Sequence, residues 1–353
     1  MNRHSWALGD RSIQLRTVAI VCAALSVVVT VPENGHCQQT CRRILIQDST
    51  LNNFVDPPGY RTGTLGELGN YKKVGSGPQP MILIPGLGFG ADVFDEFMSR
   101  WGDKYTMYAV TLAGFGGTPA PPSPATNVSF GEQTWTNGAM RGLEKLIAQE
   151  GIKKPILVGH WATGTQLALR LALAHPENAR AVIILSGSSR FVMADTARMP
   201  LRVPLDKRIA AIDRHMAPSW YATVTRETWD DNNFLPIDYA ISPVRGLRLW
   251  REAAEPPIHV WVRYLCEFYA QDITLDLARL TIPTLIVKPG HDPVDLGPGQ
   301  KYMDAWTHLS WQGIPEMNPK IQMAMIPDSR VCLWFDQPEK LDAVVGEFLR
   351  SVK

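Results

Sequence analysis

The sequence predicts an α/β fold in which a mostly parallel, doubly wound sheet carries a helical cap insertion. Six short apolar runs have the length and composition of buried strands. Helical stretches lie between these runs, and such alternation is typical of a parallel sheet covered by helices on both faces. One long helix-rich segment breaks the alternation. With 353 residues and 45% hydrophobic content, the chain can bury one large core of this kind.

The predicted strands are continuous apolar runs, because a strand in the middle of a covered sheet is buried on both faces. In chain order they span residues 81–84, 107–110, 156–158, 181–185, 284–287 and 321–326. The predicted helices span residues 138–150, 164–175 and 338–352. Short loops join these elements, as is usual in α/β units.

The segment that breaks the alternation spans residues 188–271 and carries four tryptophans, Trp220, Trp229, Trp250 and Trp261. Its length suffices for a lid over the carboxyl edge of the sheet, where ligands bind in open α/β folds. We therefore expect a helical cap at 188–271, between a first core part at 38–187 and a second at 272–353. Tryptophans in such a cap either belong to its core or line a ligand pocket.

The first 37 residues differ in kind from the rest. Arg3, Arg11 and Arg16 precede an uncharged apolar run at 17–31, and turn formers and small residues follow up to Cys37. This order is typical of a secretory signal peptide. The run is shorter than the roughly 17 to 25 residues that a spanning helix needs. We expect a secreted or periplasmic protein, anchored in a membrane through this segment if the signal is not cleaved.

The net charge bears on the kind of partner, and the cysteine and histidine spacing bears on disulfides and metal sites. Thirty-five basic and 34 acidic residues leave a formal charge of +1, so no overall field favours nucleic acid. A small-molecule ligand or substrate is the expected partner. Five cysteines without paired spacing predict no disulfide framework, and Cys266 and Cys332 are expected to be buried core thiols. No histidine or carboxylate pair has metal-ligand spacing, so we expect neither metal nor cofactor.

Several segments, in chain order, resemble landmarks of the α/β-hydrolase superfamily and its capped members. They are residues 82–90 (ILIPGLGFG), 110–118 (VTLAGFGGT), 155–164 (PILVGHWATG), 285–292 (LIVKPGHD) and 330–338 (RVCLWFDQP). The resemblance covers roughly residues 70–187 and 280–350 and implies an α/β-hydrolase-type fold. In that family, a strand, a sharp turn and a helix present a nucleophile whose base and acid follow later in the chain.

Matching the motifs residue by residue implies a degenerate catalytic triad. Trp161 stands at the nucleophile position, Asp292 at that of the acid and Val331 at that of the histidine base. An indole is no nucleophile and an isopropyl group carries no proton, so the resemblance does not extend to serine-type hydrolysis. Shifting the match by one or two residues places Ala162 or Thr163 at the turn and recovers no serine.

The backbone of the turn around residue 161 should be less strained than in a family member with a nucleophile there. A nucleophile turn is strained by about 1 to 3 kcal/mol and needs small residues nearby. Gly159 fits this need, but Thr163 does not. We expect a relaxed turn, with the Trp161 ring in the former acyl pocket and its N–H bonded to Asp292 or Thr163.

The resemblance also assigns a loop that would bind a ligand oxygen. Backbone groups of Gly86, Leu87 and Ala162 occupy the family's oxyanion positions, although Pro85 replaces the histidine that usually precedes them.

Two histidines remain as candidate catalytic groups beside Asp292. His160 directly precedes the nucleophile position and is either a hydrogen-bonded structural residue or a proton-transfer group. His291 follows a predicted strand at the carboxyl edge of the sheet and is either a functional group or an ordinary loop residue.

Three functional hypotheses follow. The first is an exported pseudoenzyme that binds a small apolar or aromatic ligand without hydrolysing it. The second is an enzyme, either a hydrolase or a cofactor-free acid/base catalyst, that uses His291, Asp292 or His160 in the same cleft. The third is an interaction protein whose cleft is filled by Trp161.

Overall fold

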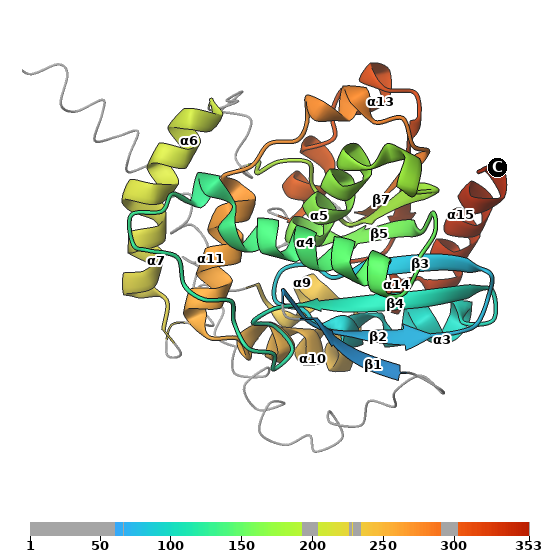
Figure 1. Ribbon diagram of the computed structural model, residues 1–353, viewed down its shortest axis with the longest axis horizontal. Helices are drawn as coiled ribbons and strands as arrows, with labels where there is room; N and C mark the ends of the chain where they lie inside the picture. Colours follow the sequence, from blue (N-terminus) through green and yellow to red (C-terminus); the bar gives the residue numbers. More distant parts are fainter. Residues whose placement is uncertain are drawn as a thin grey trace, which may run out of the picture.

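The computed structural model describes residues 61–65, 67–192, 204–225, 228, 234–290 and 303–352. Within these residues, eight strands form one sheet in the order β1-β2-β4-β3-β5-β6-β7-β8 (Figure 1). The strands are β1 (Arg61–Leu65), β2 (Leu68–Val74), β3 (Gln79–Ile84), β4 (Tyr105–Leu112), β5 (Ile156–His160), β6 (Ala181–Leu185), β7 (Thr284–Gly290) and β8 (Ile321–Pro327). Strands β3 to β8 are parallel to one another. Strands β1 and β2 pair antiparallel at one edge of the sheet.

All six predicted strands are confirmed, and they form the parallel part of the sheet. The sequence analysis missed β1 and β2. Strand β2 carries Lys72 and Lys73 and has no continuous apolar run, since it lies beside the edge strand and is partly exposed. Its place in the sheet therefore depends on pairing with β4, which is distant in sequence.

Helices flank the sheet, and those predicted at 138–150, 164–175 and 338–352 are among them. They are α3 (Asp95–Trp101), α4 (Thr134–Gln149), α5 (Trp161–Ala174), α14 (Leu333–Asp336) and α15 (Pro338–Ser351). Helix α5 begins three residues before its predicted start, directly at Trp161. Helix α3 was not predicted. It is held to α15 by Arg100, whose Nε donates to Asp342 Oδ2 at 2.8 Å.

The segment after β6 is helical in its described part. It contains α6 (Leu205–Ala211), a π-helical turn (Ile212–Met216), α7 (Ala217–Thr223), α9 (Pro236–Tyr239), α10 (Pro243–Ala254) and α11 (Ile258–Tyr269), which we call the cap helices. Figure 1 shows α6, α7 and α11 together at one end of the sheet, away from α15. The domain boundaries at 188 and 271 stay predictions.

The cap helices contact loops at the carboxyl ends of the strands. In α11, the Tyr264 hydroxyl donates to the carbonyl of Ala113, in the turn after β4, at 3.1 Å. A β-carbon at Gly88, after β3, would lie 3.1 Å from Nε1 of Trp261. Trp261 itself is buried and donates to the Ala253 carbonyl at 2.9 Å, so this tryptophan stabilises the joint between α10 and α11.

Helix α11 also supplies a buried ion pair that holds α4. Glu267 Oε1 accepts from Arg263 Nε at 2.6 Å and from the Trp135 backbone at 3.1 Å. Its other carboxylate oxygen accepts from the backbone and hydroxyl of Thr136 at 2.8 and 2.7 Å. Because the first N–H groups of a helix lack intrahelical partners, this carboxylate caps α4 from another element.

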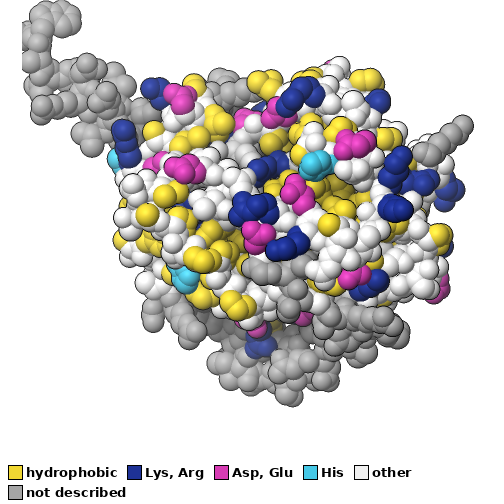
Figure 2. Space-filling model, in the orientation of Figure 1, with side chains coloured by type: hydrophobic (Ala, Val, Ile, Leu, Met, Phe, Trp, Pro, Cys, Tyr) yellow, Lys and Arg dark blue, Asp and Glu magenta, His cyan; other side chains and the backbone are white. Residues whose placement is uncertain are grey.

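Acidic and basic side chains are interspersed on the face shown in Figure 2, in keeping with the near-zero net charge. None of the helices in the described residues is long and apolar enough to cross a membrane. The predicted signal peptide at 1–37 lies outside the described residues.

Candidate functional site

The turn at the end of β5 keeps the strained geometry of a nucleophile turn. Trp161 has φ +43°, and Ala162 has φ 6° and ψ −108°. Left-handed φ is uncommon for a bulky side chain. The expectation of a relaxed turn is therefore wrong: the strand, the helix and the loops packed on them impose the geometry even with an indole at its centre.

Two glycines allow this close packing. A β-carbon at Gly164 would collide with the carbonyl oxygens of Ile84 and Pro85, and one at Gly159 would lie 2.6 Å from the Gly164 carbonyl oxygen. Thr163 is accommodated with its side chain buried. The expectation that Thr163 would obstruct the turn was wrong, because the tight approach falls one residue later.

The Trp161 ring is buried among aromatic side chains, in line with the expected packing. Its centroid lies 5.6 Å from Phe234, 6.1 Å from Tyr239 and 6.3 Å from Trp306. Among the described residues, Trp161 Nε1 has no hydrogen-bond partner, and Thr163 Oγ1 has none either. Thr163 is thus not the acceptor that was expected.

His160 is a structural histidine. Its Nδ1 accepts from the Gly86 N–H at 3.3 Å, and its Nε2 lies 3.2 Å from the Val331 carbonyl oxygen, which can only accept. These two partners require the neutral tautomer with the proton on Nε2. Burial lowers the pKa of His160 to about 3. Both nitrogens are occupied, so His160 cannot serve as a proton-transfer group in this geometry.

Val331 is fully buried, and the neighbouring Cys332 is a buried free thiol whose pKa burial raises. Cys266 is likewise buried and free. A buried thiol is poorly ionised and unreactive. Both cysteines therefore behave as core residues, as the sequence predicted.

His291 and Asp292 lie outside the described residues. In the described part, no serine, threonine or cysteine side chain is hydrogen-bonded to an imidazole, so no alternative nucleophile–base pair is present there. Those same residues contain no group of three or more histidine, cysteine, aspartate or glutamate side chains that could hold a metal ion.

The predicted oxyanion residues Gly86, Leu87 and Ala162 are all buried at the turn. A β-carbon at Gly86 would lie 2.7 Å from the Trp161 β-carbon, so the loop after β3 lies directly against the nucleophile position. The structure thus brings these three residues together with Trp161 and His160.

Sequence reasoning missed Glu252, which reaches the same loop from cap helix α10. Its Oε1 accepts from the Gly90 N–H at 2.7 Å. Burial raises the pKa of Glu252 to about 7, and the hydrogen bond from Gly90 and the charge of Arg248 oppose that rise. The two residues are 162 positions apart in sequence, and no local pattern signals their contact.

Helix α10 presents three side chains at helical spacing to the segment of residues 90–96. Arg245 donates to Glu96 Oε2 at 2.7 Å, Arg248 donates to the Asp92 carbonyl at 3.5 Å, and Glu252 is the third member. Residues three and four apart lie on one helix face. The row therefore joins α10 to the end of the loop after β3 and to the helical segment that follows it.

A comparison of the sequence with models of protein families agrees with these observations. The model of the alpha/beta hydrolase family matches residues 81–344. The chain belongs to this family. The match covers the oxyanion loop, the turn at Trp161, the cap helices and the loop of Val331, which is the order of landmarks that the sequence predicted.

Curated relatives of the chain are esterases by name. It is 26% identical over 222 residues to the pimeloyl-[acyl-carrier protein] methyl ester esterase of Aeromonas hydrophila, covering 61% of this chain and 78% of that protein. It is 28% identical over 121 residues to the enzyme of the same name from Proteus mirabilis, covering 34% of this chain but 41% of that protein.

Solved structures of family members share the fold at low sequence identity. An E-2-(acetamidomethylene)succinate hydrolase has a TM-score of 0.54 at 17% identity, over 83% of this chain and 99% of that chain. A hydrolase from Oleispira antarctica has a TM-score of 0.57 at 13% identity, over 80% and 94%. At these identities the likeness shows the fold alone.

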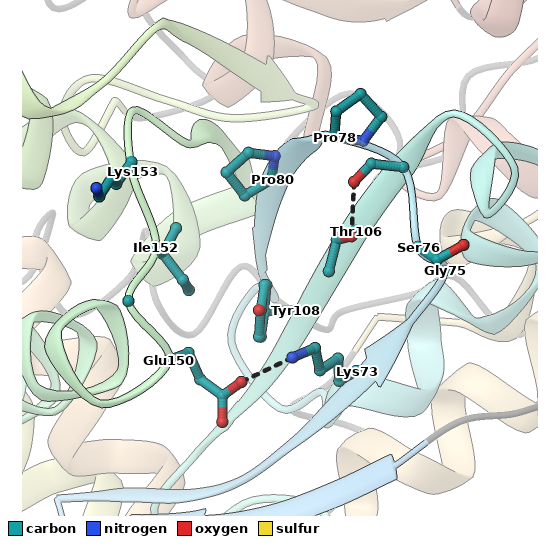
Figure 3. Close-up of a pocket in the computed structure, with 12 residues that line it drawn as sticks. Lys73, Gly75, Ser76, Pro78, Pro80, Thr106, Tyr108, Glu150, Ile152 and Lys153 are labelled. Carbon is teal, nitrogen blue, oxygen red and sulfur yellow. Dashed lines mark hydrogen bonds and ion pairs between the residues drawn. The ribbon is translucent and has the colours of Figure 1, made fainter.

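A concavity of about 610 Å³ lies near the amino ends of β3 and β4. Lys73, Thr106, Tyr108 and Glu150 contribute to its lining, and Figure 3 shows Lys73 and Glu150 pointing toward one another, 2.9 Å apart. Because Lys73 and Glu150 neutralise each other, this groove offers a ligand no net charge from that pair. It does not include the turn at Trp161.

Proposed function

We propose that the protein is an exported member of the family that binds a small apolar or aromatic molecule at Trp161 and does not hydrolyse it by a serine mechanism. One observation carries the proposal: Trp161 and Val331, the residues that the motif match places at the nucleophile and base positions, are both buried and carry an indole and an isopropyl group. The predicted signal peptide supports the export.

The size of the loss excludes a residual serine route. In a serine protease, removing the nucleophile or the histidine alone lowers turnover by about 10⁶. What remains in such variants comes from the oxyanion positions and from substrate binding. At the matched positions 161 and 331 both side chains are absent, and His160 is held neutral by its two hydrogen bonds. The parts of the site that remain are thus the oxyanion positions and the surroundings of Trp161, which can bind a ligand.

The aromatic surroundings of Trp161 support an apolar or aromatic ligand. The ring of Trp306 lies against Trp161 and also near Phe191 and Phe268, at 5.9 and 5.5 Å between centroids. Aromatic side chains with a few polar groups are the usual lining of small-molecule sites.

A second candidate is a hydrolase or a cofactor-free acid/base catalyst that uses His291 and Asp292. Two observations favour it: the relatives named above are esterases, and the turn at Trp161 keeps its strained geometry. Strain of this kind clusters at active sites.

Three measurements on the purified protein test the proposal. We expect no labelling by a fluorophosphonate probe, no turnover of p-nitrophenyl butyrate beyond that of His291→Ala and Asp292→Asn variants, and saturable binding of 2-acetylnaphthalene in equilibrium dialysis. Turnover that disappears in the His291→Ala variant would establish the second candidate instead. Mass spectrometry of the N-terminus of exported protein tests the cleavage near residue 37.

A further inference from the structure

Trp161 and Ser186 leave the sheet side by side with the same unusual backbone. Strands β5 and β6 are parallel, and His160 pairs with Leu185 as their last register partners. The next residues, Trp161 and Ser186, have φ of +43° and +51°. Two adjacent non-glycine residues in the left-handed region mark a place where strain is tolerated, as at ligand-binding sites.

Each of the two residues carries a buried hydrogen-bond donor. Within the described part of the chain, Trp161 Nε1 and Ser186 Oγ have no hydrogen-bond partner. Three further buried hydroxyls around the same strand ends also lack one there, namely those of Thr163, Thr165 and Ser188. An unpaired buried polar group costs about 1 to 3 kcal/mol. Five such groups thus gather at the carboxyl ends of β5 and β6 in the described part of the chain, where a bound acceptor would satisfy them.

The segments that carry these donors are packed on one another. A β-carbon at Gly187 would collide with Thr165 Oγ1, so the first turn of α5 lies directly against the turn after β6. Two backbone groups of that turn are paired: the Ser186 N–H donates to the Val287 carbonyl at 2.9 Å, and the Gly187 carbonyl accepts from Trp311 Nε1 at 2.8 Å. The Ser186 hydroxyl, by contrast, has no hydrogen-bond partner in the described part of the chain.

We infer that Trp161 and Ser186 form a polar subsite for the uncharged carbonyl oxygen of an aromatic ligand. This rests on the proposed function, because it names the chemical class of the ligand that binds beside Trp161. An indole N–H only donates and a hydroxyl can donate, so together they suit an acceptor atom. Both are neutral, and burying a carboxylate without a counter-charge is far more costly than burying a carbonyl.

A pair of isosteric probes tests the subsite. In 2-acetylnaphthalene and 2-isopropenylnaphthalene, a carbonyl oxygen and a methylene group occupy the same place. Equilibrium dialysis gives the dissociation constant of each for the purified protein and its variants. We expect the wild type to bind the ketone about 10-fold more tightly, which corresponds to one well-made hydrogen bond.

Variants of Trp161 and Ser186 test whether these two side chains cause the preference for the ketone. Ser186→Ala and Trp161→Phe each remove one donor, and we expect the ratio to fall to about 1 or to reverse, since the ketone then loses a partner but still has to be desolvated. Ser351→Ala is the control, because its hydroxyl donates to Phe348 at the far end of α15, and the ratio should stay unchanged.

The outcomes separate the two proposals. If neither probe binds the wild type, the proposed function fails and the subsite fails with it. If both bind and the hydrocarbon binds equally or more tightly, the proposed function stands and the subsite is overturned, the donors then being paired with water. A ketone preference that survives Ser186→Ala and Trp161→Phe also overturns it.

Discussion

His160 donates from Nε2 to the backbone carbonyl of Val331 at 3.2 Å, while its Nδ1 accepts from the Gly86 N–H at 3.3 Å. One buried imidazole thus links the turn at Trp161 to the loop of Gly86 and to the loop of Val331. The residue next to Trp161 thus holds the framework of the site together, and its two hydrogen bonds leave no nitrogen free for proton transfer.

Removing this imidazole should destabilise the fold. His160→Phe leaves the Gly86 N–H and the Val331 carbonyl buried without their partner, and we expect unfolding to become easier by about 2 to 4 kcal/mol. Urea denaturation measures the change. His175→Phe is the control, because that histidine is partly exposed and should change stability by less than about 0.5 kcal/mol. Equal losses in the two variants would contradict the structural role.

His160 also predicts an acid sensitivity. Its pKa is lowered to about 3 in the folded protein, so the unfolded chain binds a proton more readily than the folded one. The stabilisation is fully present above about pH 6.5 and is lost as the pH falls toward 3. Between pH 6.5 and 4.5, we expect the wild type to lose about 2 to 3 kcal/mol more than His160→Phe. Parallel pH profiles in the two proteins would contradict this.

A serine at position 161 and a histidine at position 331 should together create esterase activity. Because the turn already has nucleophile geometry, Trp161→Ser with Val331→His should raise p-nitrophenyl butyrate turnover at least about 10-fold over wild type without a change at Thr163. Trp161→Ala with Val331→His is the matched control and should stay at background. A folded double variant that shows no gain, alone and with Thr163→Gly, counts against the residue mapping.

The buried Arg263–Glu267 pair should be essential for stability. Glu267→Gln leaves Arg263 uncompensated and weakens the cap of α4, so we expect a loss of about 3 kcal/mol in thermal or urea unfolding. The control is Glu67→Gln, whose partner Arg141 is 59% exposed, and it should cost less than about 1 kcal/mol. A comparable cost at both sites would show that burial does not set the effect.

Glu252 predicts a pH effect of opposite sign. Its pKa is raised to about 7, so the folded state binds the proton more readily than the unfolded chain. The stabilisation is fully present below about pH 4.5 and is lost as the pH rises through 7. Arg248 opposes this shift, whereas Asp92 and Glu255 add to it. Glu252→Gln keeps an acceptor for Gly90 and should be about 1 to 2 kcal/mol more stable than wild type at pH 8.5 but not at pH 4.5. Equal stability of the two proteins at both pH values would exclude this titration.

The apolar runs of the parallel strands were predictable because each is local in sequence and buried on both faces. The strand at β2 was not, since its place depends on pairing with β4. The turn at Trp161 illustrates the same limit within the site. Its position and its side chain could be identified from neighbouring residues, but its strained backbone could not, because Gly164 and the carbonyl oxygens behind it impose the geometry.

The sequence by itself determined the α/β alternation, the place of the turn after β5 and the chemical character of Trp161 and Val331, since these depend on residue type and local order. Only the tertiary structure decided that His160 is neutral and doubly bonded, that Glu252 reaches Gly90, and that Trp161 and Ser186 stand side by side. These properties arise from contacts between segments far apart in the chain, whose burial and hydrogen bonding exist only once the sheet and its helices have assembled.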